Sequence, residues 1–160
     1  MGVAESYRGP SGAILPGLGV ELGSALSRLR ELFRQNGAAL AYLFGSHALD
    51  EAEASSDIDI AILLDQTPEG LYAAYRRIML GLQEALQTER FDLVLLNDAP
   101  PTLQFEVVCH GRPIYSRNEQ VLNDFEMSAI RKFQDTAHLR AVQNEYLKQR
   151  AREWYSSKRP

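Results

Sequence analysis

Two aspartates alternate with isoleucine in the segment DIDIAILL, which begins at Asp57 and has the length and composition of a strand. Side chains alternate between the two faces of a strand, so Asp57 and Asp59 point to one face while Ile58 and Ile60 point into the core. Two carboxylates this close repel one another unless both are solvated at the strand end or a divalent cation binds between them. Hard oxygen ligands in this arrangement suit Mg²⁺ or Mn²⁺.

A third aspartate lies near the start of the next predicted strand, RFDLVLLN, which covers residues 90–97. Asp92 shares a strand face with Val94, and Phe91 and Leu93 take the other face. If the two strands are neighbours, Asp92 completes a cluster of three carboxylates. Such a cluster can hold two metal ions, one activating an attacking hydroxyl and the other holding the leaving phosphates.

Gly45 and Ser46 follow the preceding predicted strand, AALAYLF, and ten residues separate Ser46 from Asp57. A glycine lets the backbone approach a phosphate with no Cβ in the way. Ser46 adds a hydroxyl, and the neighbouring backbone N–H groups can form a small anion-binding concavity. A phosphate site on one side and metal-binding carboxylates on the other indicate a site for a nucleoside triphosphate.

The elements that must position these residues belong to one domain. The 160 residues are 45% hydrophobic and 24% charged, as in a globular protein. The order of helical and strand periodicities predicts an α/β (α+β) fold with a small mixed sheet flanked by helices. No apolar run has the length of a membrane span, no secretory signal is recognisable, and Cys109 is the lone cysteine, so we expect a cytoplasmic protein without membrane contact.

The last part of the chain differs in charge from the rest. Residues 1–130 carry 9 Lys and Arg against 18 Asp and Glu, whereas residues 131–160 carry 8 against 3. From Glu119 to about Trp154 there is no Gly or Pro, which predicts a long helix, either straight or bent. Its far end mixes aromatic residues with Lys and Arg, a composition typical of protein interfaces and also suited to RNA. A protein partner is favoured, because the acidic body would oppose nucleic acid.

The Gly-Ser pair, the gap and the Asp-x-Asp on a strand resemble the signature of the DNA polymerase β superfamily of nucleotidyltransferases. The small size resembles the minimal nucleotidyltransferase (MNT) antitoxins, which pair with HEPN ribonuclease toxins. The resemblance covers about residues 39–150 and includes RFDLVLLNDAPPTLQFEVVCHGRPIYSR, similar to the family's stretch with the third aspartate. The leader lies outside the resemblance, and we expect three parts: a flexible leader rich in Gly, Pro and Ser (1–16), a nucleotidyltransferase domain (17–118) and a C-terminal helix (119–160) that packs on the domain and extends to a partner.

The resemblance also implies roles for individual residues. Gly45 and Ser46 would hold the triphosphate of ATP, and Asp57 and Asp59 would bind Mg²⁺, with two ions expected. Asp92 would bind the catalytic metal and help to deprotonate the acceptor hydroxyl. The implied activity is in-line transfer of AMP from ATP to a tyrosine of a HEPN toxin, with pyrophosphate leaving, which silences the ribonuclease. The implied state is a hetero-oligomer with that toxin.

One stretch departs from the family pattern. The family commonly has an Arg and then a Gly soon after Gly-Ser, whereas this chain reads GSHALD from Gly45 to Asp50. The departure leaves two alternatives open. One is a binding antitoxin with a weak or inactive nucleotide site, which acts by occlusion. The other is a nucleotidyltransferase that acts on a small molecule or an RNA end.

Overall fold

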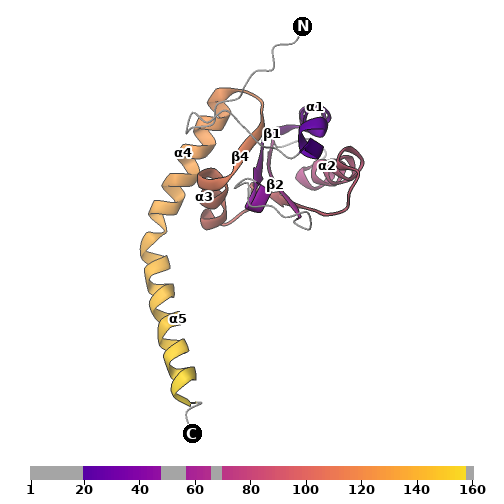
Figure 1. Cartoon of the computed structure of the whole chain (residues 1–160). Helices are drawn as coiled ribbons and strands as arrows, with labels where there is room; N and C mark the ends of the chain where they lie inside the picture. Colours follow the sequence, from indigo (N-terminus) through magenta and orange to yellow (C-terminus); the bar gives the residue numbers. More distant parts are fainter. Residues whose placement is uncertain (1–19, 48–56, 66–69, 158–160) are drawn as a thin grey trace.

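The computed structural model describes residues 20–47, 57–65 and 70–157, which form one small sheet with helices on both faces and a long helix at the C-terminal end (Figure 1). The strand order is β3-β2-β1-β4. The elements, in chain order, are α1 (Val20–Gln35), β1 (Ala38–Phe44), the short 3-10 turn η1 (Gly45–His47), β2 (Ile58–Leu64), α2 (Leu71–Leu86), β3 (Phe91–Leu95), α3 (Pro101–His110), β4 (Arg112–Ser116), α4 (Glu119–Asp135) and α5 (Ala137–Ser157). The leader predicted for residues 1–16 lies outside the described residues.

The sheet is mixed, and its one parallel pair is the pair that carries the predicted site. β1 runs antiparallel to both β2 and β4. β2 and β3 run parallel, joined by a crossover through α2. This α/β architecture with a small mixed sheet confirms the fold class expected from the sequence.

Helices cover both faces of the sheet, which explains why β1 and β2 are apolar along nearly their whole length. Figure 1 shows α1 and α2 on one side of the sheet and α3 and α4 on the other. On the first side, Ile58, Ile60 and Ile62 of β2 pack with both helices. On the second side, Leu40 and Tyr42 of β1 pack with α3 and α4. The strands are therefore held rigidly between two apolar layers.

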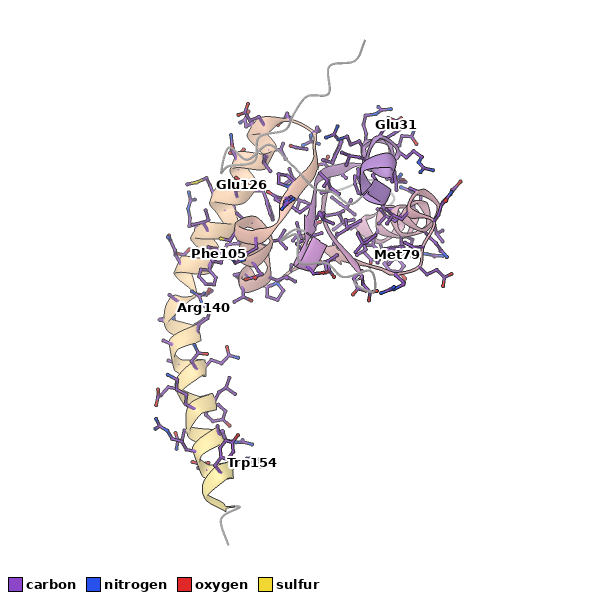
Figure 2. The ribbon with its side chains drawn as sticks, viewed as in Figure 1. Glu31, Met79, Phe105, Glu126, Arg140 and Trp154 are labelled. Carbon is purple, nitrogen blue, oxygen red and sulfur yellow. The ribbon has the colours of Figure 1, made fainter. Side chains whose placement is uncertain are left out.

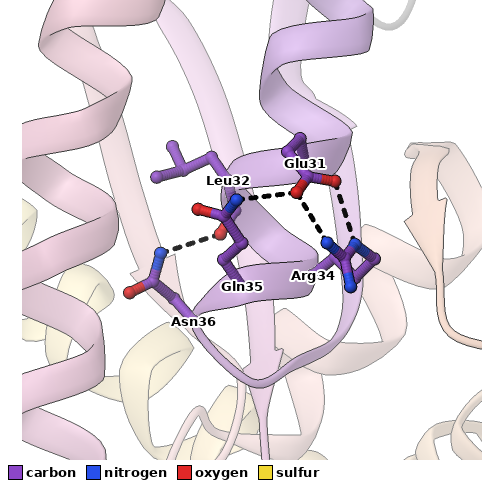
Figure 3. A network of polar contacts seen from close by, with 5 residues as sticks. All are labelled: Glu31, Leu32, Arg34, Gln35 and Asn36. Carbon is purple, nitrogen blue, oxygen red and sulfur yellow. Dashed lines mark hydrogen bonds and ion pairs between the residues drawn. The ribbon is translucent and has the colours of Figure 1, made fainter.

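The end of α1 fixes the start of β1. The Asn36 side chain donates to the Leu32 carbonyl at 2.8 Å, and Gly37 follows with a φ of +70°, a left-handed conformation that suits glycine. Figure 3 shows this end of the helix, where Arg34 and Gln35 both donate to the Glu31 carboxylate. Both contacts hold the pKa of Glu31 down, at about 2. Asn36 and Gly37 thus end the helix directly before β1.

The C-terminal helix is long, as predicted, but it is interrupted at Thr136. The Thr136 hydroxyl donates toward the carbonyls of Lys132 and Phe133, the kind of side-chain contact that bends a helix. Arg140 then donates to the Phe133 carbonyl at 2.6 Å, and its guanidinium lies 3.5 Å from the centre of the Phe133 ring. That ring stacks on Phe105 of α3, with centroids 3.9 Å apart (Figure 2). Beyond this anchor α5 extends away from the domain (Figure 1).

The described side chains of α5 are exposed almost throughout. Its large apolar side chains that face solvent are Leu139, Val142, Tyr146, Leu147, Trp154 and Tyr155. Among the helices that the structure describes, none is both long and apolar enough to span a lipid bilayer.

Candidate functional site

Two of the three predicted aspartates lie side by side at one end of the parallel strand pair. Asp59 of β2 is the direct register partner of Asp92 of β3. Neighbouring strands are about 4.8 Å apart, and register partners present their side chains on the same face. That face is the one covered by α3 and α4, because Ala61 and Val94, two residues further along each strand, belong to that apolar layer. Asp59 is partly buried and Asp92 is exposed.

Gly45 lies directly against this pair. It follows Phe44, the last residue of β1, which is the register partner of Asp59 on the other side of β2. Its φ is +67°, and a Cβ at this position would come within 2.1 Å of the Asp59 Oδ2 atom. A glycine is therefore required here for two separate reasons, the backbone conformation and the nearby carboxylate. Ser46, the next residue, is partly buried in η1.

Asp57 has a different neighbour. Its Oδ1 atom lies 3.2 Å from Nε of Arg90, in an ion pair whose side chains are both about half exposed. The backbone N–H of Ile58 donates to the Arg90 carbonyl at 3.1 Å. Arg90 therefore lies beside Asp57, directly before the first paired residues of β2 and β3. Asp57 and Arg90 thus form the row of side chains next to Asp59 and Asp92.

The carboxylates at this strand end supply some of the oxygen ligands that a divalent cation requires. Asp59 and Asp92 bring two carboxylates together on one face, and the missing Cβ of Gly45 lets the Asp59 carboxylate lie directly against the Gly45 backbone. Within the part of the chain that the structure describes, however, no group of three or more His, Cys, Asp or Glu side chains is arranged to hold a metal ion. The predicted third ligand, Asp57, is engaged by Arg90. Asp59 and Asp92 are therefore the residues here that could hold Mg²⁺, with Asp57 next to them.

Arg90 is the residue at this site that the sequence analysis did not single out. A signal for it exists, because Arg90 stands two residues before Asp92, as Asp57 stands two residues before Asp59. The same alternation that places the two aspartates on one face also places Arg90 there. His47 begins the GSHALD departure, and its continuation at residues 48–50 lies outside the described residues.

A buried acid lies on the same face of the sheet. Tyr42, two residues before Phe44 on β1, donates its hydroxyl to Glu126 Oε1 of α4 at 3.0 Å. Glu126 is labelled in Figure 2 and is 7% exposed. Burial raises the pKa of Glu126, and the Tyr42 hydrogen bond acts in the opposite direction. The contact joins α4 to the strand that ends at Gly45.

Two hollows on the described surface lie elsewhere, along α1. One of about 340 Å³ lies between α1 and β4, and one of about 460 Å³ lies between α1 and α2. Neither is lined by Asp57, Asp59 or Asp92. Both are on the far side of the sheet from the aspartates, so neither hollow adjoins the strand end that carries them.

A family model and several solved structures show which proteins this chain is similar to. The family model described as "Polymerase beta, Nucleotidyltransferase" matches residues 27–120, more than half of the chain. The chain therefore belongs to the polymerase beta nucleotidyltransferase family. No curated protein matches it.

Among solved structures, the chain is similar to proteins of toxin–antitoxin complexes. One is a toxin–antitoxin with AMP-PNP, at 28% identity and a TM-score of 0.63, over 76% of this chain and 98% of the other. A second is a complex of an MNT antitoxin with a tri-AMPylated HEPN toxin from Shewanella oneidensis, at 28% identity and a TM-score of 0.58, over 77% and 96%. A third is the toxin–antitoxin MntA-HepT, at 28% identity and a TM-score of 0.58, over 77% and 97%.

Proposed function

We propose that this protein is an MNT antitoxin that transfers AMP from ATP to a tyrosine of a cognate HEPN ribonuclease toxin and thereby neutralises it. The observation that carries the proposal is the in-register pair Asp59 and Asp92 beside the Gly45 turn. Family membership supports the transfer of a nucleotide. The AMP-PNP and AMPylated-toxin complexes of the structural neighbours support ATP as the donor and the toxin as the acceptor.

In this proposal each part of the site has one task. The Gly45 and Ser46 backbone and the Ser46 hydroxyl bind the triphosphate, and Asp59 and Asp92, joined by Asp57 once it leaves Arg90, would hold Mg²⁺. When bound, Mg²⁺ neutralises charge on the phosphates and favours the ionised form of the acceptor hydroxyl. Asp92 accepts the proton of the toxin's tyrosine. The tyrosine oxygen then forms a bond to the α-phosphorus, the bond from that phosphorus to the bridging oxygen breaks, and pyrophosphate leaves with the electron pair.

The proposal extends to α5, which we assign to the contact with the toxin. Its exposed Tyr146, Trp154 and Tyr155, interspersed with Arg150, have the composition of interface hot spots. A helix with this little packing against its own domain gains most of its stability from contacts with something else. The resulting state is a hetero-oligomer of antitoxin and toxin, and the structural neighbours from toxin–antitoxin complexes support it.

The experiment is incubation of the purified protein with labelled ATP, Mg²⁺ and its cognate toxin. Label and added mass should appear on the toxin with the wild-type protein and with the control Asp124→Asn, an exposed aspartate of α4. They should be lost with Asp59→Asn and with Asp92→Asn. Equal transfer by wild type and the Asp59→Asn variant would contradict the proposal.

The same variants distinguish the occlusion alternative, which the engagement of Asp57 by Arg90 and the exposed face of α5 favour. If the Asp59→Asn protein binds the toxin and blocks its ribonuclease as well as the wild type does, neutralisation depends on binding and not on nucleotide transfer. If transfer occurs to RNA ends and not to protein, the acceptor in our proposal is wrong.

A further inference from the structure

The four side chains at the end of the parallel pair form two adjacent rows on one face of the sheet. Asp59 and Asp92 make the inner row, and Asp57 and Arg90 make the outer row. The set contains three carboxylates and one guanidinium. Arg90 therefore places a positive charge directly beside these three carboxylates, where a triphosphate would approach.

The Arg90 backbone is fixed while its side chain is accessible. Its carbonyl accepts from the Ile58 N–H at 3.1 Å, and its own N–H donates to the Thr88 hydroxyl at 3.1 Å. The side chains of Arg90 and Asp57 are 51% and 57% exposed. An ion pair this exposed contributes little free energy, so a competing ligand can separate it at low cost. The guanidinium can then turn to a new partner without any movement of the strand.

We propose that Arg90 is a phosphate-binding residue of this site that exchanges partners. Without metal it neutralises Asp57, and when Asp57 is engaged by a divalent cation, its guanidinium binds the triphosphate of the nucleotide. A planar guanidinium with several N–H donors matches phosphate oxygens well. The inference rests on the proposed nucleotide site and assigns to it a cation from the residue directly before β3 rather than from the segment after Gly45-Ser46.

The test is two binding measurements on the full chain. Mn²⁺ binding without nucleotide is followed by electron paramagnetic resonance, and AMP-PNP binding with Mg²⁺ is followed by calorimetry. The variants are Arg90→Ala and Arg90→Lys, and the control is Arg76→Ala, an exposed arginine of α2 on the other side of the sheet.

The two affinities of Arg90→Ala should change in opposite directions. Mn²⁺ should bind about two- to fivefold more tightly, because Asp57 no longer has a competing partner. AMP-PNP should bind about tenfold more weakly, because a charged hydrogen-bond donor to the phosphates is lost. Arg90→Lys should keep part of the nucleotide affinity, and Arg76→Ala should match the wild type.

Other outcomes would overturn the inference. A purely structural role for Arg90 would lower the melting temperature and weaken both ligands together. Unchanged AMP-PNP binding by Arg90→Ala, with normal binding by the wild type, would reject the role of Arg90 and leave the proposed function intact. If the wild-type protein binds no AMP-PNP in the presence of Mg²⁺, the nucleotide site itself is wrong and the inference fails with it.

Discussion

The substitution Gly45→Ala tests the site at its most crowded point. The new Cβ would stand 2.1 Å from Oδ2, 3.0 Å from Cγ and 3.4 Å from Cβ of Asp59. The carboxylate oxygen must retreat by about 1 Å even to reach the shortest tolerable contact of about 3 Å. The added Cβ would stand at an ordinary contact distance from the Asp59 Cβ, so the clash involves the carboxylate alone. We therefore expect the carboxylate to rotate away while the strand stays in place. A misplacement of about 1 Å at a reacting centre costs roughly 100-fold in rate, and we expect a loss of that size.

The same substitution also strains the backbone. At a φ of +67° an alanine costs about 1–2 kcal/mol relative to glycine. In a chain of this length, that corresponds to a melting temperature lower by about 2–8 °C. A loss of activity could therefore arise from instability alone, so a control is needed that has the strain without the clash.

Gly70 provides this control, because its φ is +88° and nothing lies within 4 Å of the Cβ that an alanine would add. Gly70→Ala should lower the melting temperature at least as much, because its φ of 88° and ψ of 156° lie in a region that residues other than glycine hardly adopt, and it should leave nucleotide transfer unchanged. The assay is transfer of labelled AMP to the toxin below both melting temperatures, with Mg²⁺·AMP-PNP binding measured alongside. If Gly45→Ala transfers AMP as fast as Gly70→Ala does, the close approach of Gly45 to Asp59 has no role in the chemistry.

Two further predictions concern regions away from the phosphate site. Glu126→Gln should raise the melting temperature at neutral pH, because burial raises the pKa of Glu126 in the folded protein and stability is lost as pH rises above the ordinary value of 4.5. The gain should shrink as the pH is lowered to 4.5, and a constant gain across a pH series of thermal melts would contradict the reasoning. The double substitution Tyr146→Ala/Trp154→Ala, at side chains 56% and 53% exposed, should weaken toxin binding at least about tenfold without changing the melting temperature. Calorimetric titration with the toxin checks this, with Lys148→Ala as the control, and equal affinities would remove α5 from the interface.

Much of the fold follows from local patterns in the sequence. AALAYLF and IDIAILL read as strands because they are short, apolar runs bounded by turn residues, and both are strands in the structure. The alternation in DIDI placed Asp57 and Asp59 on one face. The neighbouring position of Asp59 and Asp92 required one assumption, that their strands are adjacent, and the β2–β3 register satisfies it.

Two features could not be read from local patterns. The ion pair of Asp57 with Arg90 joins residues 33 positions apart and depends on the register between two strands. That register is set by packing across the whole sheet and not by either segment alone. The helix break at Thr136 occurs where the sequence has no Gly or Pro, the residues that usually predict one. At the break, the Thr136 hydroxyl donates a hydrogen bond to the preceding turn, and the Arg140 guanidinium packs on the Phe133 ring.

Because the helix is broken at Thr136, a small rotation at this junction would move the far end of α5 over a long distance. Its 21 residues span about 31 Å at the usual rise per residue. A rotation of about 10° at the junction would carry the far end through about 5 Å, a large step compared with the tolerance of a reacting centre. At this junction lie three stacked side chains, those of Phe105, Phe133 and Arg140. In the proposed complex, the position of the toxin's acceptor relative to Asp92 would then depend on the packing of these three side chains at the junction.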